Sequence, residues 1–443
     1  MKKAAPAVKQ LMPCFMMSPL SVAQYLPAEE MSFDLVVMDE ASQLRPEDAV
    51  GAIARGKQVV IVGDPKQLPP TDFFARTSGE DPVGDQDPTA ADEKSILDAA
   101  MPILSPVQRL KWHYRSRHGS LIAFSNKEFY DNELVIFPSP QQHHPEYGVQ
   151  FVHVEEGCYR GQTNPNEAMR VAAAVFEHAR KFPKRSLGVV ALNMKQAELL
   201  RLEIDRLAAE DPMFETWRKK FDGTLEPFFV KNLENVQGDE RDVMFISTVY
   251  GKNENGIVFQ RFGPINAKGG HRRLNVLFTR AKRRMVVFST MMPSDIRVDE
   301  TSSWGVRALQ GFLEFAKSRL LDTARITDRE PDSDFERSVA AAIRDEGYEA
   351  VPQVGVVGYF IDIGIRHPKR VGEFMLGVEC DGSTYHSTKS ARDRDRLRQQ
   401  QLEELGWSIH RIWSLDWFRD PKLERKKLRE AMARAVERER PIG

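Results

Sequence analysis

Two acidic residues follow a largely apolar stretch near the start of the chain. The stretch Phe33–Met38 runs directly into Asp39 and Glu40. An apolar run of this length is typical of a strand in a parallel sheet that is buried on both faces. Open α/β sheets bind ligands beyond the carboxyl ends of such strands. Phosphoryl transfer needs a carboxylate that holds a metal and a group that orients water, and this pair could supply both. Taken alone, however, such a pair is more often a solvated strand end.

The neighbouring sequence makes the catalytic interpretation specific. Five short motifs occur in order, and they resemble motifs II to VI of superfamily 1 helicases of the RNA-surveillance type. They are Asp39-Glu40-Ala41-Ser42-Gln43, Gly63-Asp64-Pro65-Lys66-Gln67-Leu68-Pro69-Pro70, His113-Tyr114-Arg115-Ser116, Val236-Gln237-Gly238-Asp239-Glu240-Arg241-Asp242 and Asn275-Val276-Leu277-Phe278-Thr279-Arg280-Ala281. The resemblance covers roughly residues 10–295 and implies a nucleic-acid-dependent ATPase.

The resemblance assigns a role to each motif. Asp39 would bind Mg²⁺, Glu40 would activate the attacking water and Gln67 would sense the γ-phosphate of ATP. Arg115 and Arg280 would be arginine fingers, because a planar guanidinium can bind a phosphate through two parallel hydrogen bonds.

Two further residues are placed beside the nucleotide by the same resemblance. Gly238 and Glu240 would lie next to ATP, with Glu240 near the ribose. ATP and Mg²⁺ are therefore the cofactors that we expect. ATP would bind between two RecA-like domains, and single-stranded nucleic acid would be the partner, held mainly through phosphates and base stacking.

The phosphate loop of this family is missing from the sequence. No Gly-x-x-x-x-Gly-Lys-Ser/Thr pattern occurs, although its backbone amides and lysine would be needed to cradle the phosphates ahead of Asp39. Three interpretations stay open: a fragment of a longer protein, a split gene whose other polypeptide supplies the loop, and a domain that has lost ATP hydrolysis. The later motifs are intact, which favours a truncated first domain.

A second acidic set lies in the last third of the chain. Asp362 falls inside the apolar stretch Tyr359–Ile365, and Glu379 and Asp381 end the stretch Phe374–Cys380. Residues two apart in a strand point to the same face, and a hairpin could bring Asp362 beside the other two. Three carboxylates together suit Mg²⁺ or Mn²⁺. The alternative interpretation is that these acids are exposed residues at the edge of a sheet. This interpretation is weakest for Asp362, because a charge in an apolar strand needs a partner.

The order of these residues resembles the PD-(D/E)xK nuclease fold, in the branch similar to very-short-patch repair endonucleases. The resemblance covers about residues 333–420 and implies metal-dependent cleavage of DNA. It makes Asp362 and Glu379 metal ligands. This branch has no lysine after the glutamate, and Asp381 occupies that position here. Asp381 and His386 would activate water or bind a second metal. Supporting candidates are Glu336 and Gln353.

Composition is compatible with several folded domains. The chain has 443 residues, of which 41% are hydrophobic and 29% are charged, and its net charge is -1. This composition excludes a disordered chain, while a neutral total neither supports nor excludes nucleic-acid binding. Four arginines alternate with acids near the C-terminus, where a salt-bridged helix face and a phosphate-binding face are equally plausible. They are Arg392, Arg394, Arg396 and Arg398.

Cysteine usage and hydropathy indicate the setting of the protein. The three cysteines, Cys14, Cys158 and Cys380, are far apart and show no spacing typical of zinc sites, which fits a reducing cytoplasm. No apolar run approaches the roughly 20 residues of a membrane span, so we expect no membrane partner.

The elements predict an α/β fold throughout. We expect a partial first RecA-like domain at 1–105, a second RecA-like domain at 106–298, a helix and linker at 299–332, and a small restriction-endonuclease-like α/β domain at 333–443. The leading function is an ATP-dependent helicase fused to a metal-dependent DNA endonuclease, with RNA as a possible substrate. One alternative is an ATP-independent nuclease whose helicase remnant grips nucleic acid. Another is an inactive platform that only binds nucleic acid.

Overall fold

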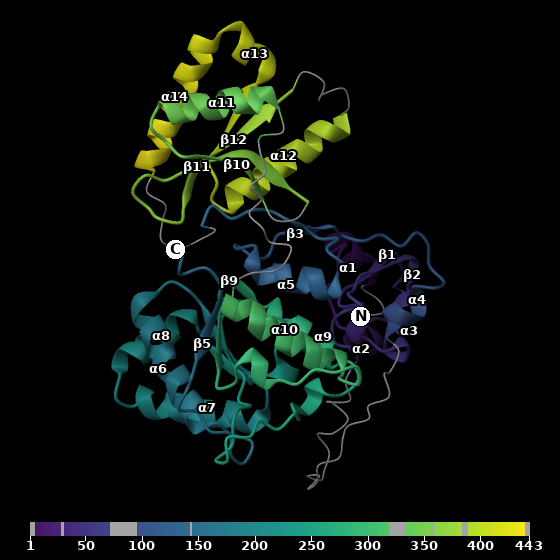
Figure 1. The fold of residues 1–443 in the computed structure, drawn as a ribbon. Helices are drawn as coiled ribbons and strands as arrows, with labels where there is room; N and C mark the ends of the chain where they lie inside the picture. Colours follow the sequence, from purple (N-terminus) through teal and green to yellow (C-terminus); the bar gives the residue numbers. More distant parts are fainter. Residues whose placement is uncertain are drawn as a thin grey trace. The chain divides into compact units, whose positions relative to one another are not determined.

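The computed structural model describes residues 5–27, 31–70, 95–141, 144–318, 331, 333–355, 358–382 and 389–438. Figure 1 shows the helices and strands of the chain. The chain divides into two compact units. The first comprises Met1–Arg109 with Ala267–Val276, and the second comprises Leu110–Asn266 with Leu277–Gly443. None of the described helices is long and apolar enough to cross a membrane.

The first unit is built around a pair of parallel strands. Strand β1 (Phe33–Met38) pairs with β2 (Gly56–Ile61), and the register places Val36 beside Val59 and Met38 beside Ile61. A small apolar core lies against the strands and includes Met38, Ala41 and Leu97. The accompanying helices are α1 (Ala5–Leu11), α2 (Pro19–Tyr25), the 3-10 turn η2 (Ala41–Gln43), α3 (Pro46–Ile53) and α4 (Ile96–Ala100).

The second unit contains a five-stranded sheet whose strands are all parallel. Its strand order is β5-β9-β8-β6-β7. Strand interiors here are buried on both faces, as the apolar runs predict. The strands are β5 (Gly148–His153), β6 (Leu187–Ala191), β7 (Phe229–Asn232), β8 (Arg241–Ser247) and β9 (Ala281–Ser289). This sheet confirms the predicted α/β class.

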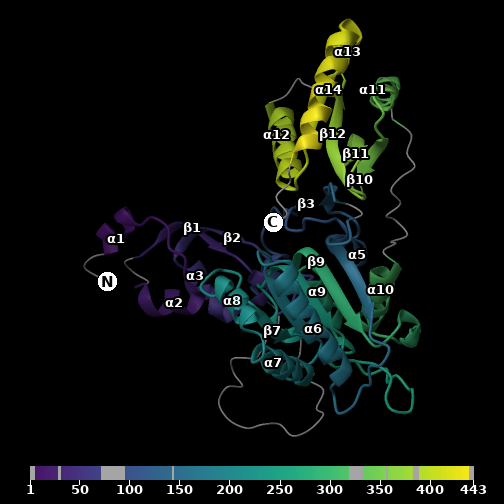
Figure 2. The ribbon, with the colours of Figure 1, turned by 90° about the vertical axis from the view of Figure 1, so that its left-hand side faces the viewer.

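Helices cover both faces of this sheet (Figure 2). One core combines strand residues such as Phe245 and Phe288 with residues of α6, α7 and α8. On the other face, aromatic rings of α5 and α10 pack together, with Phe124 and Phe312 5.3 Å apart between ring centroids. The helices of the second unit that lie around this sheet are α5 (Ser120–Phe129), α6 (Pro165–Lys181), α7 (Met194–Ala208), α8 (Pro212–Phe221) and α10 (Trp304–Ser318). Helix α9 (Gly270–Phe278) belongs to the first unit up to Val276.

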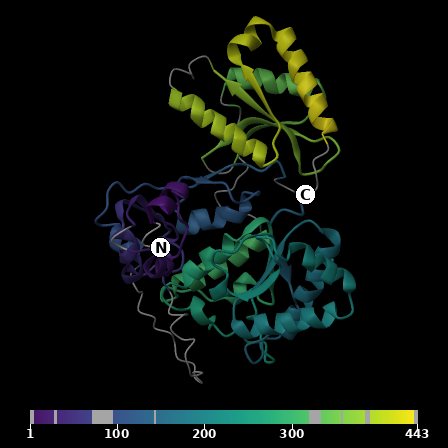
Figure 3. The same cartoon turned by 180° about the vertical axis from the view of Figure 1, so that it is seen from behind.

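The C-terminal part of the second unit is a small α/β domain with a mixed four-stranded sheet. Its order is β10-β11-β12-β13, with two antiparallel pairings followed by a parallel one. Helices α11, α13 and α14 pack on one face and α12 lies on the other (Figure 3). The elements are α11 (Asp334–Asp345), β10 (Ala350–Gly355), β11 (Phe360–Arg366), β12 (Phe374–Asp381), α12 (Lys389–Glu404), β13 (Ile409–Trp413), α13 (Ser414–Arg419) and α14 (Pro421–Glu437).

A short segment at the start of the second unit joins the core of this C-terminal domain. Strand β3 (Trp112–His113) pairs with β4 (Val135–Ile136), and Phe137 follows in the same apolar cluster as Trp407. The indole Nε1 of Trp407 donates a hydrogen bond of 2.9 Å to the carbonyl oxygen of Pro138. The backbone N–H of Phe374 donates one of 2.8 Å to the carbonyl oxygen of Pro140. Residues 135–140 therefore form part of the wall of the C-terminal domain.

Candidate active sites

The first acidic pair lies at the carboxyl end of β1, as predicted. Glu40 has a left-handed backbone with φ of 52°, and its N–H donates a 2.9 Å hydrogen bond to Oδ1 of Asp39. The Nε2 group of Gln43 donates to Oε2 of Glu40 at 3.0 Å. A left-handed conformation is uncommon for a residue with a side chain and often occurs at functional sites.

The second motif lies next to the first because β1 and β2 are parallel and end at one edge of the sheet. The close approach of the two motifs requires glycine at position 63, because a Cβ atom there would come within 2.9 Å of the backbone nitrogen of Ser42. The side chain of Gln67 donates to Oδ2 of Asp64 at 3.0 Å, and Nδ2 of Asn275 donates to the carbonyl oxygen of Lys66 at 2.9 Å. The structure thus brings together residues of three predicted motifs within the first unit.

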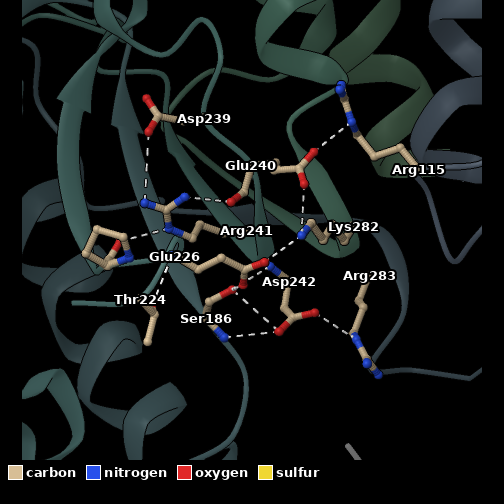
Figure 4. Close-up of polar contacts among 11 residues, drawn as sticks. Arg115, Ser186, Thr224, Glu226, Asp239, Glu240, Arg241, Asp242, Lys282 and Arg283 are labelled. Carbon is tan, nitrogen blue, oxygen red and sulfur yellow. Dashed lines mark hydrogen bonds and ion pairs between the residues drawn. The ribbon is translucent and has the colours of Figure 1, made fainter. Parts of the chain in front are cut away.

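Arg115 and Glu240, both predicted to contact the nucleotide, pair with each other in the second unit (Figure 4). Nε of Arg115 lies 2.8 Å from Oε2 of Glu240, and Nζ of Lys282 lies 2.9 Å from Oε1. The same lysine lies 2.5 Å from Oε1 of Glu226. Ser186 donates a hydrogen bond from its hydroxyl to the other oxygen of Glu226. Lys282 is therefore the shared cation of two carboxylates.

The charges of this network depend on one another. Burial is the largest influence on Glu226 and Glu240 and opposes their ionisation. The hydrogen bonds and charge of Lys282, together with the Ser186 hydroxyl at Glu226 and the charge of Arg115 at Glu240, jointly outweigh it and hold the pKa of both carboxyls below the ordinary value. Burial likewise opposes the charge of Lys282, and its hydrogen bonds with these two carboxylates raise its pKa overall. A charged lysine between two ionised carboxylates is the stable state near neutral pH.

Replacing Lys282 by methionine is expected to destabilise the second unit by about 1–2 kcal/mol at pH 7, because two partly screened carboxylates lose their cation. The destabilisation caused by this replacement should become smaller below about pH 4. Carboxyls whose pKa is lowered by folding contribute to stability only while they are ionised. Thermal unfolding at several pH values measures this. Lys57→Met, which removes an exposed pair with Asp34, is the control. Equal midpoints for the two variants would contradict the inferred role of Lys282.

Two predicted residues of the second unit remain to be placed, Gly238 and Arg280. Gly238 has φ of 83° and open space where a side chain would project, which suits a close approach by a ligand. Arg280 is 3% exposed, and its guanidinium donates to Oγ1 of Thr279 at 3.0 Å. The role of Arg280 as an arginine finger stays a prediction.

In the C-terminal domain, the structure brings Asp362 and Glu379 together on neighbouring strands. Ile363 lies opposite Val378 in the antiparallel register, so the next position places Asp362 opposite Glu379. Oδ2 of Asp362 accepts a 2.6 Å hydrogen bond from the backbone N–H of Cys380. The predicted hairpin between these strands is confirmed.

The two carboxyls share an environment that opposes charge. Burial, followed by the charge of Glu379, raises the pKa of Asp362 to about 7. Burial also raises the pKa of Glu379, although a hydrogen bond from Tyr359 and the charges of Arg411 and Arg398 act in the opposite direction. A pair of neighbouring acids with raised pKa values, buried at the end of a strand, is a candidate catalytic or metal site.

Asp381 is less closely associated with this pair than predicted. Nε of Arg411 lies 3.4 Å from Oδ2 of Asp381. Among the described residues, no three histidine, cysteine or acidic side chains are placed so that they could hold a metal together. The predicted three-carboxylate site is thus not assembled in this conformation, and the roles of Asp381 stay predictions. His386 lies outside the described residues.

The two supporting candidates contact each other beside the pair. Glu336 and Gln353 are both buried, and Nε2 of Gln353 donates to Oε2 of Glu336 at 3.0 Å. Gln353 has φ of 50° and stands opposite Asp362, between the paired residues Pro352 and Val354. Backbone strain of this kind persists only where the surroundings enforce it.

Comparison with known families matches three parts of the chain. One AAA-domain model matches residues 16–73 and a second matches residues 93–292. The restriction-endonuclease model REase_MTES_1575 matches residues 335–432. The chain carries superfamily 1 helicase domains followed by a restriction-endonuclease-like domain.

Relatives among curated proteins include two that are named as ATP-dependent helicases. The chain is 30% identical to an uncharacterized ATP-dependent helicase of Mycoplasma pneumoniae, over 97% of this chain and 39% of that protein. It is 30% identical to its counterpart MG140 of Mycoplasma genitalium, over 98% of this chain and 40% of that protein. The chain therefore spans about two fifths of the length of these relatives. The structure of the PRRSV helicase is 13% identical and covers 60% of this chain and 37% of that one, but its TM-score is 0.27, so the fold assignment rests on the sheets themselves.

One segment of the helicase part approaches the phosphate-loop pattern but folds differently. Gly51, Gly56 and Lys57 have the loop's spacing, although Gln58 replaces its serine or threonine. Gly51 lies inside helix α3 and Gly56 begins strand β2. A phosphate loop runs from a strand into a helix, so this helix-to-strand segment has the opposite order.

Two residues beside the nuclease-like carboxylates were given no role in positioning them by the sequence analysis. The hydroxyl of Tyr359 donates to Oε1 of Glu379 at 2.8 Å, and the guanidinium carbon of Arg398 lies 5.7 Å from the ring centroid of Tyr359. Tyr359 was identified only as the start of an apolar strand, while Arg398 was one of four interchangeable arginines. The side chains of Arg392 and Arg394 lie outside the described residues.

Proposed function

We propose that this chain is the motor and nuclease portion of an ATP-dependent nucleic-acid helicase, and that its C-terminal domain cleaves DNA with a divalent cation. The carboxylate pair Asp362 and Glu379, at the strand ends of a restriction-endonuclease-like domain, is the observation that carries this proposal. DNA is favoured over RNA as the substrate because of the likeness to endonucleases that act on DNA.

The donor chemistry of the pair fits Mg²⁺ or Mn²⁺. Two neighbouring buried carboxylates repel each other, and a hard divalent cation removes that repulsion while accepting oxygen ligands. When bound, such a cation lowers the pKa of water and stabilises the charge that develops on a phosphodiester. Asp362 and Glu379 would hold it, while Asp381 and His386 remain our candidates for activating water or binding a second ion.

For ATP, we propose that the predicted helicase residues act together once a phosphate loop is supplied. A further segment of the same protein, or a separate polypeptide, would provide that loop. The residues concerned are Asp39, Glu40, Gln67, Arg115, Gly238, Glu240 and Arg280. Their support comes from the motif order and the matched helicase domains.

The first experiment is cleavage of supercoiled plasmid and of single-stranded DNA by the purified chain, with Mg²⁺, Mn²⁺ or a chelator and with or without ATP. We expect cleavage that requires the cation and does not require ATP. Glu379→Gln should reduce the rate at least about 100-fold, because several kcal/mol of transition-state stabilisation are lost. Asp345→Asn, at an exposed position on α11, should cleave like the wild type.

Two outcomes would redirect the proposal. Cleavage that Glu379→Gln retains would place the reaction elsewhere or in a contaminant. Absence of cleavage by a folded chain, together with salt-sensitive DNA binding, would favour the binding-platform alternative.

A further inference from the structure

Tyr359 links the nuclease-like carboxylate pair to the helicase part of the second unit. It precedes β11, and its hydroxyl donates a 2.8 Å hydrogen bond to Oε1 of Glu379 on β12. The tyrosine hydroxyl and the carboxylate are both largely buried, and burial followed by the charge of Glu379 raises the pKa of the phenol. The phenol is thus a neutral donor that fixes one oxygen of the carboxylate.

The ring of Tyr359 rests on Phe137, which lies within the sequence segment that the helicase-domain model matches and packs into the wall of the C-terminal domain. Its centroid lies 5.1 Å from that of Phe137, with the planes tilted by 42°. Phe137 is 5% exposed and follows β4, which pairs with the strand that carries Trp112 and His113. Phe137 in turn shares an apolar cluster with Trp407. Because tyrosine has few rotatable bonds, a packed ring leaves its hydroxyl little freedom.

We propose that Tyr359 is a positioning residue for the metal ligand Glu379, and that Phe137 of the helicase part holds it in place. This inference rests on the proposed function, in which Asp362 and Glu379 bind the cation. Partners that orient a ligand carboxylate commonly change metal affinity or activity by about 10- to 100-fold when they are removed. The helicase part would thus help to set the geometry of the nuclease site.

The test compares Tyr359→Phe with Tyr348→Phe. The first removes the hydroxyl and keeps the packed ring, whereas Tyr348 packs against the core on the other face of the sheet. Binding of Mn²⁺ to each full chain is measured by electron paramagnetic resonance of the free ion. We expect Tyr359→Phe to weaken Mn²⁺ binding at least about 10-fold. It should also raise the Mn²⁺ concentration needed for half-maximal cleavage more than it lowers the rate at saturating Mn²⁺. Tyr348→Phe should match the wild type.

A second variant tests the contact with the helicase part. Phe137→Leu keeps the Tyr359 hydroxyl and an apolar side chain, and should weaken Mn²⁺ binding in the same direction but less. Thermal unfolding of each variant shows whether the fold is retained, and Phe137→Leu carries the test if Tyr359→Phe lowers the midpoint.

The outcomes separate this inference from the proposed function. Wild-type chain that neither binds Mn²⁺ nor cleaves DNA would remove the proposed function itself. Wild-type chain that does both, with folded Tyr359→Phe and Phe137→Leu variants of unchanged Mn²⁺ affinity, would overturn the positioning role alone.

Discussion

Asp362→Asn is expected to abolish metal-dependent cleavage while raising the stability of the metal-free chain. The asparagine oxygen can still accept the hydrogen bond from the N–H of Cys380, so the local fold is retained. Removing one of two buried like charges, however, removes their repulsion and an unfavourable burial of charge. We expect the rate to fall at least about 100-fold and the free energy of unfolding to rise by about 1–2 kcal/mol near pH 8.

The opposite signs of these two effects distinguish a functional acid from a structural one. Active sites commonly retain groups that destabilise the fold. Cleavage assays and thermal unfolding in the presence of a chelator measure the two effects. Asp345→Asn is the matched control, since Asp345 is exposed and pairs with Arg425 at 3.5 Å. A less stable Asp362→Asn variant would mean that the carboxylate serves the fold.

Glu167→Gln is expected to have the largest effect on the stability of the second RecA-like sheet. Glu167 is 0% exposed in the first turn of α6 and joins the ends of two strands. Its Oε1 atom accepts from the hydroxyl of Ser247 at 2.6 Å and from the N–H of Val249 at 2.8 Å. Its Oε2 atom accepts from the N–H and hydroxyl of Thr290, each at 3.2 Å. The NH2 group of a glutamine accepts no hydrogen bond, so the buried N–H of Val249 or of Thr290 would lose its acceptor. We expect a cost of about 2–4 kcal/mol in the free energy of unfolding.

This effect should depend on pH. Burial raises the pKa of Glu167 to about 7 despite the four hydrogen bonds. A carboxyl whose pKa is raised by folding contributes stability below its unfolded pKa, and this contribution is lost as the pH rises through about 7. The difference in stability between wild type and Glu167→Gln should therefore shrink by roughly 2–3 kcal/mol between pH 5 and pH 8.

Hydrogen exchange of amides in β8 and β9, corrected for the intrinsic rate at each pH, measures the opening free energy of this sheet. Glu177→Gln, at an exposed position on the same helix, is the control. A difference that grows with pH would mean that Glu167 is ionised throughout and that burial does not govern it.

The parts of the fold that follow from local patterns were predicted well. The expected burial of β1 on both faces was wrong, since Leu35 and Val37 are 48% and 59% exposed. Apolar runs nevertheless located β1 and β12, because an apolar run is the pattern of a strand that packs in the core of a sheet. Asp362 was found for the same reason: a charge inside such a run is conspicuous. Strand β5 was not predicted, since Gly148–His153 alternates polar and apolar residues within a polar region.

The parts of the site that depend on distant contacts could not be predicted. Tyr359 and Glu379 are twenty positions apart, and their hydrogen bond depends on the register between β11 and β12. Arg411 opposite Glu379, and its proximity to Asp381, follow from the parallel pairing of β13. Glu167 resembles an ordinary acid in the first turn of a helix, and only the fold shows that it is buried.

The most direct test of the central claim is Mn²⁺ titration of the purified chain by calorimetry, with Asp362→Asn and Asp345→Asn measured beside the wild type. We predict saturable Mn²⁺ binding by the wild type and by Asp345→Asn, and its loss in folded Asp362→Asn. Equal binding by all three proteins, or none by the folded wild type, would contradict a metal site at Asp362 and Glu379.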